Sequence, residues 1–293
     1  MDRKFTSEDI FSYEKVNDNL FIVKESYSWL HRFPIGVVIG ENKAYVIDSG
    51  LGCGGSLKEY VENNITKKPL VCIVTHGHPD HAAGALDFEE RYLNEADWPL
   101  LKEMLDPQRR VDDLEAFSLK DPEIMAYGKE HVNNCEGMTF KNINDGDVIE
   151  DGVRMEIIGM PGHSKGQIAV YLPEFKIAFV SDSVLKRTHF NKADMKGLEE
   201  YEAVLKRFID HVDPDTSLII GHEQSYVGNF KGWPTLQLAK DLKTAIAEVR
   251  AHDTQNDEIR EAFFKHQKAA EYRSFVHIHG CASIIYSEKI YFE

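Results

Sequence analysis

The sequence predicts an α/β fold, because short apolar segments rich in β-branched residues alternate with segments of helical periodicity. Near the N-terminus, residues 20–23, 35–40 and 44–48 have the composition of strands. A helix is expected over about residues 56–63, before a further buried strand at residues 70–74. This alternation favours an α/β architecture over a helical bundle or an all-β sandwich.

The next part of the chain is charged and helix-prone. Residues 89–93 and 98–105 carry apolar side chains three and four positions apart, which is the spacing of an amphipathic helix. The stretch from residue 106 to residue 132 is long for a simple connection between core elements. We therefore predict that residues 97–132 form a helical insertion.

Strands and helices return in the second half. Strands are expected at residues 138–140, 153–158, 167–172, 176–180 and 217–221. Helices are expected at residues 198–211, 236–251 and 257–271, and residues 282–286 and 289–292 are expected to pair as a closing hairpin. The whole chain, residues 1–293, is predicted to be one domain, with a core at about residues 18–230 and a C-terminal extension of helices and hairpin at residues 233–293.

Composition limits the class of protein. The formal net charge is −15, from 34 basic and 49 acidic side chains. A nucleic acid is therefore not expected as the main partner, because phosphate binding requires a basic face. No apolar run is long enough to span a bilayer, and the N-terminus lacks the apolar core of a signal peptide. The four cysteines show no C-x-x-C spacing, so we expect a cytoplasmic protein with reduced thiols and no membrane partner.

The run from Thr75 to His81 is the most informative motif. It has the pattern H-x-H-x-D-H, in which His76, His78, Asp80 and His81 follow a predicted strand on a loop broken by glycine and proline. Ligands that alternate along a loop can converge on one ion, whereas the same residues on a helix would diverge. Neutral imidazole and carboxylate groups suit zinc, iron or manganese. The competing interpretation is a polar surface loop with histidines present by chance.

Three further candidates lie just after predicted strands, where a site at the edge of a sheet would recruit ligands. They are His163 in P-G-H-S-x-G, Asp182 and His222. A single histidine in such a place is more often an ordinary surface residue. Together with the first run, however, these residues make five histidines and two aspartates. That number is enough for two metal ions with one bridging carboxylate and one coordination position open for water.

In this order, the motifs H-x-H-x-D-H, P-G-H-S-x-G, a post-strand Asp and G-H resemble those of the metallo-β-lactamase superfamily. The resemblance covers about residues 20–223 and includes Asp48 at a strand end. It implies an αββα sandwich, in which two sheets face each other with helices outside and metals at one edge. It also implies that His76, His78 and His163 hold a first metal, that Asp80, His81 and His222 hold a second, and that Asp182 bridges them. Asp48 would hydrogen bond to the ligand loop and hold its shape.

The resemblance implies a metal-dependent hydrolase that uses two divalent ions, zinc or alternatively iron or manganese. A hydroxide shared by the ions would attack a small ester, thioester, lactone or amide, and Asp80 could move the released proton. Two alternatives stay open: a mononuclear iron oxidoreductase similar to persulfide dioxygenases, and a phosphodiesterase. A pure metal-binding module is disfavoured, because an open coordination position has no storage role.

The substrate is expected to be a small molecule, and five more residues are candidates for contact with it or with the metal ligands. Lys186, Arg187 and His189 lie just beyond Asp182 and could meet an anionic substrate, and His277 and His279 alternate along a possible strand. For each of them, a solvated or core position is an equally good interpretation. The insertion and the C-terminal extension either line the substrate pocket or mediate self-association into a homo-oligomer, and both hypotheses stay open.

Overall fold

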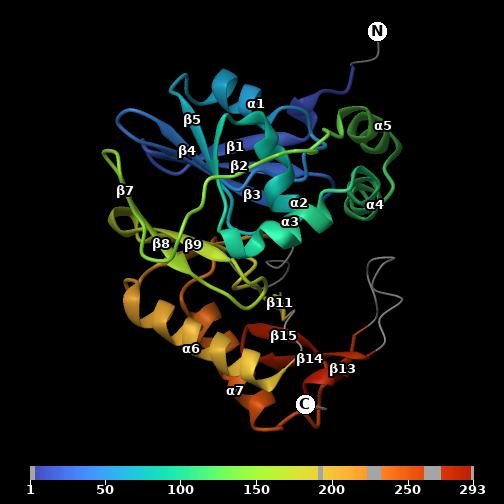
Figure 1. The fold of residues 1–293 in the computed structure, drawn as a ribbon, viewed down its shortest axis with the longest axis vertical. Helices are drawn as coiled ribbons and strands as arrows, with labels where there is room; N and C mark the ends of the chain where they lie inside the picture. Colours follow the sequence, from blue (N-terminus) through green and yellow to red (C-terminus); the bar gives the residue numbers. More distant parts are fainter. Residues whose placement is uncertain (1–3, 191–193, 223–231, 261–271, 292–293) are drawn as a thin grey trace.

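The computed structural model describes residues 4–190, 194–222, 232–260 and 272–291. Two β-sheets pack face to face, and helices cover the outer face of each sheet (Figure 1). This arrangement confirms the αββα sandwich that the resemblance implies. A third, smaller sheet lies beside the second helical layer and was not expected.

The first sheet has the strand order β1-β2-β3-β4-β5-β6, and the second has the order β12-β10-β9-β8-β7. The strands of the first sheet are β1 (Phe11–Lys15), β2 (Leu20–Ser26), β3 (Arg32–Ile39), β4 (Ala44–Ile47), β5 (Leu70–Ile73) and β6 (Glu90–Tyr92). Those of the second are β7 (Val148–Glu150), β8 (Arg154–Gly159), β9 (Ile168–Leu172), β10 (Ile177–Ser181) and β12 (Ser217–Ile220). Within these sheets, β4, β5 and β6 run parallel, as do β10 and β12.

The layers follow from alternation along the strands. Leu20 and Ile22 of β2 face the core between the sheets, while Phe21 and Val23 face the helices outside the first sheet. In the second sheet, Phe179 of β10 likewise faces inward. Burying one such large apolar side chain contributes about 1.5–3 kcal/mol to stability, so a one-residue slip in register would be costly.

The helices of the first layer are α1 (Leu57–Asn64), α3 (Trp98–Met104), α4 (Pro107–Phe117) and α5 (Pro122–His131), and the one-turn helix α2 (Pro79–Ala82) carries part of the histidine motif. Aspartate followed by proline starts both α4 and α5. Asp106 accepts a hydrogen bond from the backbone N–H of Arg109, and Asp121 caps α5 in the same way. The predicted insertion is therefore helical, and its α4 and α5 lie on the right of Figure 1.

The second layer contains α6 (Met195–His211) and α7 (Gln237–Arg250), which pack against each other. Both helices begin and end close to their predicted bounds. The third sheet has the order β11-β15-β14-β13, from β11 (Arg187–His189), β13 (Glu258–Ile259), β14 (Ser274–His279) and β15 (Ala282–Ser287). Short 3-10 turns are Ser7–Asp9, Ala83–Asp87, Glu95–Asp97, Pro173–Phe175 and Glu288–Tyr291.

Four sequence-based expectations are wrong. Residues 89–93 are not helical, because β6 pairs there with β5, and residues 138–140 form no strand. The predicted helix at residues 257–271 begins instead with β13, and residues 261–271 lie outside the described part. The closing hairpin joins β14 to β15 across Gly280 and Cys281, because residues 289–291 belong to a 3-10 turn.

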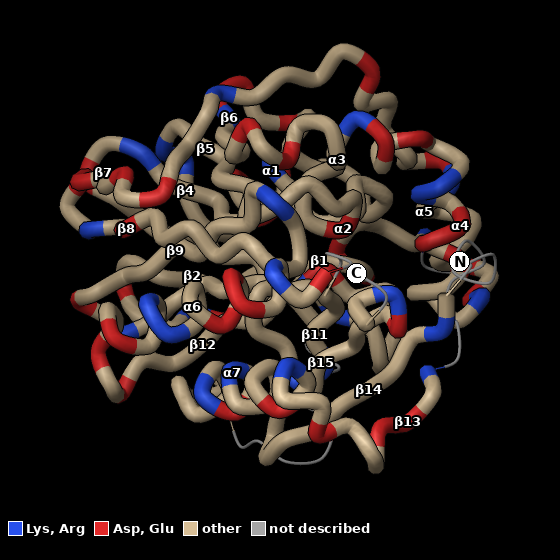
Figure 2. The backbone as a smooth tube through the Cα atoms, turned by 60° about the horizontal axis from the view of Figure 1, so that its bottom comes forward, with Lys and Arg blue, Asp and Glu red and all other residues tan. Residues whose placement is uncertain are grey.

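The surface is mixed in charge. Acidic residues appear on most of the outer elements, with basic residues interspersed among them (Figure 2). Within the described ranges, none of the helices is both long enough and apolar enough to cross a membrane.

Candidate metal centre

The predicted metal ligands come from four strand ends that meet at one edge of the sandwich. The H-x-H-x-D-H motif follows β5, and His163 lies in the loop between β8 and β9. Asp182 follows β10 directly, and His222 follows the parallel neighbour β12 after one glycine. Because parallel neighbours end at the same edge of a sheet, their C-terminal residues lie close together.

The first group consists of His76, His78, His163 and Asp182, whose donor atoms all lie within 4.8 Å of one another. Nδ1 of His78 is 2.9 Å from Nε2 of His76 and 2.9 Å from Nε2 of His163. Burial, and then the neighbouring histidines, hold the pKa of His76 and that of His78 well below the ordinary value. These imidazoles are therefore neutral, which is the form that binds a metal.

The second group consists of Asp80, His81 and His222, again with donor atoms within 4.8 Å. Asp182 touches both groups, because its Oδ2 lies 3.5 Å from Nε2 of His163 and 3.0 Å from Nε2 of His222. The other oxygen of Asp182, Oδ1, lies 3.5 Å from Nε2 of His81. One carboxylate thus stands between two sets of nitrogen donors.

Two buried atoms test whether this donor set fits metal ions. Nε2 of His81 and Oδ1 of Asp182 are buried and have no hydrogen-bond partner among the described residues. An unsatisfied buried polar atom is costly, and a cation placed between these atoms would remove that cost. Nitrogen and carboxylate donors of this kind suit zinc, iron or manganese. The residues therefore fit divalent metal ions.

Asp48 hydrogen bonds to His81 of the second group, on the ring nitrogen that faces away from the other candidate ligands. Its Oδ2 accepts a hydrogen bond from Nδ1 of His81 at 2.9 Å, and also from the hydroxyls of Thr75 and Ser181. Burial lowers the pKa of His81, but the carboxylates of Asp80, Asp182 and Asp48 together raise it to about 10. Asp48 therefore fixes the ring of His81 with Nε2 facing the metal-ligand groups.

Asp97 holds the two loops of the first group together, and sequence reasoning missed it. Its Oδ2 accepts hydrogen bonds from the backbone N–H of Gly77 at 2.9 Å and from Oγ of Ser164 at 2.6 Å, and its Oδ1 accepts one from the N–H of Gly166 at 2.6 Å. The side chain is fully buried. The sequence around Asp97 gives no sign of this role, because its hydrogen-bond partners lie 20 to 69 positions away along the chain.

The additional candidates after Asp182 lie on or beside β11. The backbone carbonyl of His189 accepts a hydrogen bond from Nδ1 of His163 at 3.0 Å. The carbonyl of Lys186 accepts hydrogen bonds from Ser283 of β15, and Arg187 is exposed. Of these three residues, His189 is thus the one that contacts a predicted metal ligand in the described structure.

His277 and His279 are not brought to the metal-ligand groups. The two ring nitrogens of His277 donate to Asp257 at 2.7 Å and to Glu248 at 2.9 Å, and His279 also bonds to Glu248. These contacts join β14 to α7. The two histidines do alternate along a strand, as the sequence suggests. They belong, however, to an ionic network of the predicted C-terminal extension that is separate from the candidate metal ligands.

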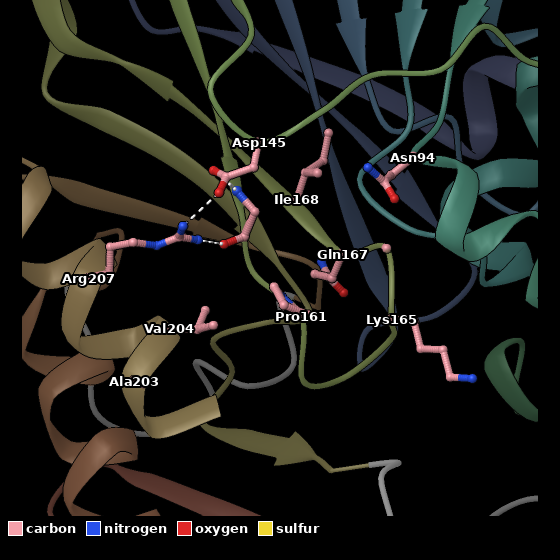
Figure 3. Close-up of a pocket in the computed structure, with 11 residues that line it drawn as sticks. Asn94, Asp145, Pro161, Lys165, Gln167, Ile168, Ala203, Val204 and Arg207 are labelled. Atoms are coloured by element: carbon pink, nitrogen blue, oxygen red, sulfur yellow. Dashed lines mark hydrogen bonds and ion pairs between the residues drawn. The ribbon is translucent and has the colours of Figure 1, made fainter. Parts of the chain in front are cut away.

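A cavity of about 470 Å³ lies beside the loop that carries His163 (Figure 3). Lys165 and Gln167 line it, and the ion pair between Arg207 and Asp145, at 2.6 Å, borders it. None of the seven predicted ligands is among its lining residues. The cavity is therefore separate from the metal-ligand groups.

Comparison with known proteins agrees with this geometry. Residues 34–222 match the family model of the metallo-beta-lactamase superfamily, and the chain belongs to that superfamily. Fold, ligand groups and relatives together make it a metal-dependent hydrolase.

Among its relatives, the chain is 28% identical over 219 residues to the acyl-coenzyme A thioesterase MBLAC2 of Gallus gallus, covering 69% of this chain and 76% of the relative. It is 28% identical to the hydroxyacylglutathione hydrolase GloC of Haemophilus influenzae, covering 62% of this chain and 81% of the relative. The structure of a metallo-beta-lactamase from Pontibacter korlensis shares the fold, with a TM-score of 0.53 and 16% identity over 78% of this chain and 95% of that chain.

Proposed function

We propose that this protein hydrolyses thioesters at a centre of two divalent metal ions, with zinc as the metal. His76, His78 and His163 would hold one ion, Asp80, His81 and His222 the other, and Asp182 both. The observation that carries this proposal is the position of Asp182, whose carboxylate lies 3.0–3.5 Å from donors of both groups. A thioester is favoured because the similar curated proteins are named for acyl derivatives of coenzyme A and of glutathione.

Bound divalent ions supply a lowered pKa for water and polarise the carbonyl group that is attacked. The chain's own residues complete the reaction. Asp80 accepts the proton of the attacking water, while the water oxygen bonds to the carbonyl carbon and the carbon–sulfur bond breaks. Sulfur leaves as a thiolate, which is stable enough near pH 8 to need no dedicated acid. Asp80 then passes its proton to the thiolate, and the new carboxylic acid releases its own proton to solvent, so the products are a carboxylate and a thiol.

Metal analysis and thioester turnover test this proposal together. Protein purified without added metal should contain about two zinc ions per chain. A chelator should abolish release of free thiol from an acyl thioester, and added Zn²⁺ should restore it. No acyl-enzyme should appear by mass spectrometry during turnover, because no side chain attacks the substrate. A trapped acyl-enzyme would contradict the mechanism, and one iron per chain would favour the mononuclear oxidoreductase alternative.

We also place the protein in the cytoplasm, on the basis of its thiols. All four cysteines are free, and Cys53, Cys72 and Cys135 are buried. Burial raises the pKa of the Cys53 thiol to about 12, so this group is inert toward oxidation. Cell fractionation would test the location, and recovery from an oxidising compartment would contradict it.

A further inference from the structure

Two backbone segments lie side by side at the second group: the loop after β4 and the end of α2. The carbonyl oxygen of His81 accepts hydrogen bonds from the N–H and from the hydroxyl of Ser49, both at 2.8 Å. The N–H of Gly84 donates to the carbonyl of Gly50 at 3.2 Å. A Cβ added to Gly84 would overlap the carbonyl oxygen of Ser49, so the two backbones are in direct contact. The loop after β4 therefore supports α2, which supplies Asp80 and His81.

Asn133 joins the far ends of these two segments. Its Nδ2 donates to the carbonyl of Ala83, the residue that caps the C-terminus of α2, at 3.1 Å, and its backbone N–H donates to the carbonyl of Gly52 at 3.4 Å. The approach is close, because a Cβ added to Gly52 would lie 3.0 Å from Oδ1 of Asn133. Sγ of Cys135 adds a weaker contact to the same Ala83 oxygen at 3.5 Å. The residue directly after the predicted insertion thus ties α2 to the loop after β4.

Arg110 of α4 holds Asn133 with both arms of its guanidinium. Nη1 donates to Oδ1 of Asn133, and Nη2 donates to the backbone carbonyl of the same residue. Because Oδ1 accepts from Arg110, the donor end of the amide is turned toward Ala83. Arg110 is one of the largest fully buried side chains, and its Nε has no hydrogen-bond partner among the described residues. A buried guanidinium is costly, and an apolar side chain of similar size would fill the space at lower cost. The contacts with Asn133 therefore point to a role for Arg110 beyond filling space.

We propose that Arg110 is a positioning residue for the second metal ion. It fixes Asn133, Asn133 fixes the end of α2, and α2 directs its two candidate ligands. This inference rests on the proposed two-metal centre and assigns the insertion a part in it, besides any role in the substrate pocket or in self-association. The effect of Arg110 should be confined to the second ion, because Asp97 joins the two loops of the first group.

The test measures the stepwise Zn²⁺ affinities of the full chain by competition with a chromophoric chelator. Arg110→Met keeps the approximate length of the side chain and removes both donors. Asn133→Asp keeps the oxygen that accepts from Arg110 and removes the Nδ2 donor to Ala83. Each variant should weaken the binding of one of the two ions about tenfold and leave the other within twofold of the wild type. The control is Arg250→Met, which removes an ion pair between α7 and Glu202 of α6, and both of its affinities should stay within twofold.

Asn133→Asp separates positioning from simple anchoring of α4. In this variant Arg110 still meets an acceptor, and the new carboxylate makes the contact an ion pair, so α4 stays anchored. If Arg110 only anchors α4, this variant should bind both ions like the wild type, and that result would overturn the proposal. If Arg110 acts through Asn133, the double variant Arg110→Met/Asn133→Asp should lose little more affinity than either single variant. Fully additive losses would mean two independent effects and would likewise contradict the proposal.

The His222→Ala variant shows which ion is affected. It is expected to keep only the first ion, since His222 belongs to the second group alone. Adding Arg110→Met to this background should therefore leave the remaining affinity within twofold. A tenfold loss in this background would place the effect at the first group or in general stability, and would overturn the positioning role.

These affinities are measured without substrate, so the inference and the proposed function can fail separately. If the wild type binds two ions and the variants behave as expected, but no thioester is hydrolysed, the thioesterase proposal fails and the positioning role stands. If thioesters are hydrolysed but both variants bind both ions as tightly as the wild type, the positioning role is wrong and the proposed function stands. A wild type that binds a single ion would contradict the two-metal centre and this inference together.

Discussion

Oδ2 of Asp97 accepts a hydrogen bond from Oγ of Ser164 at 2.6 Å, and the same oxygen accepts from the backbone N–H of Gly77. Ser164 follows His163 directly, and Gly77 stands between His76 and His78. One buried carboxylate therefore sets the relative position of the two loops that supply the histidines of the first group. The added Cβ of any other residue at position 77 would lie 3.0 Å from the carbonyl oxygen of Asp97, a tight contact, so glycine favours this close approach.

We predict that Asp97→Asn weakens metal binding at the first group by about 10–100-fold, because the amide NH₂ faces N–H and O–H donors and cannot accept from them. Asp151→Asn is the matched control. Asp151 also accepts several hydrogen bonds, from Asn42, Lys43 and Tyr45. It lies in the turn between β7 and β8 and, in the described structure, contacts none of the loops that carry the candidate ligands. Competition with a chromophoric chelator measures the affinities. Equal loss of affinity in both variants would mean that Asp97 acts only through general stability.

The contacts of Asp182 predict how metal content depends on it. Asp182→Ala should lower occupancy at both positions, because its carboxylate lies beside donors of both groups. His222→Ala should remove the second ion and spare the first, since His222 belongs to the second group alone. Elemental analysis of metal per chain after dialysis distinguishes these results. Retention of two metals by the Asp182 variant would exclude a bridging role.

A third prediction concerns pH and the ionic network of the extension. His277 lies between Asp257 and Glu248, His279 shares Glu248, and the hydroxyl of Tyr286 donates to Asp257. Burial lowers the pKa of His277, but hydrogen bonds to Glu248 and Asp257 raise it above its ordinary value of 6.5. A raised pKa in the folded state stabilises the protein fully below about pH 6.5, and this stabilisation is lost as pH rises through the folded-state pKa.

The Tm of the wild type should therefore fall by about 2–4 °C more than that of His277→Gln between pH 6.5 and pH 9. Thermal denaturation followed by circular dichroism, with both proteins at equal metal content, measures the difference. His211→Gln is the control, since His211 pairs with Glu156 at an exposed site. Parallel pH curves for the wild type and His277→Gln would show that the charge of His277 does not stabilise the extension.

Much of the fold, and the clustering of the candidate ligands, could be predicted from sequence because both depend on local patterns. Strands such as β4 and β5 are short apolar runs, and the candidate ligands follow their ends directly. β6 was missed because its residues are charged. Glu90 lies on this edge strand, and its carboxylate pairs with Lys43 and Lys141 instead of entering a core, so no apolar alternation marks the strand.

Apart from Asp48, which the resemblance pointed to, the supporting residues were not accessible from sequence, because their roles arise from contacts distant in sequence. Asp97 is indistinguishable locally from any aspartate before a helix. The third sheet was missed for the same reason. Its β11 pairs in parallel with β15, almost a hundred residues later, and the intervening sequence gives no signal of that register.

The packing of α4 on α5 leads to a last prediction, about Gly128. An alanine at an exposed interior helix position stabilises by about 1 kcal/mol relative to glycine. At position 128, however, the added Cβ would overlap Cδ2 of Leu114, which is fully buried. We expect Gly128→Ala to destabilise the protein by about 1–3 kcal/mol, since overpacking outweighs helix propensity.

Leu114 and Phe117 belong to the same helix, and the ring of Phe117 lies 4.9 Å from that of Phe33, which packs against His222. A displaced Leu114 should therefore also disturb the surroundings of the second group, and Gly128→Ala should raise KM for a thioester more than it lowers metal content. The double variant Gly128→Ala/Leu114→Val, which shortens the side chain that the new methyl meets, should recover most of both losses. Urea unfolding and KM measurements on the single and double variants test this prediction. Additive losses in the double variant would show that the Gly128–Leu114 contact does not position α4.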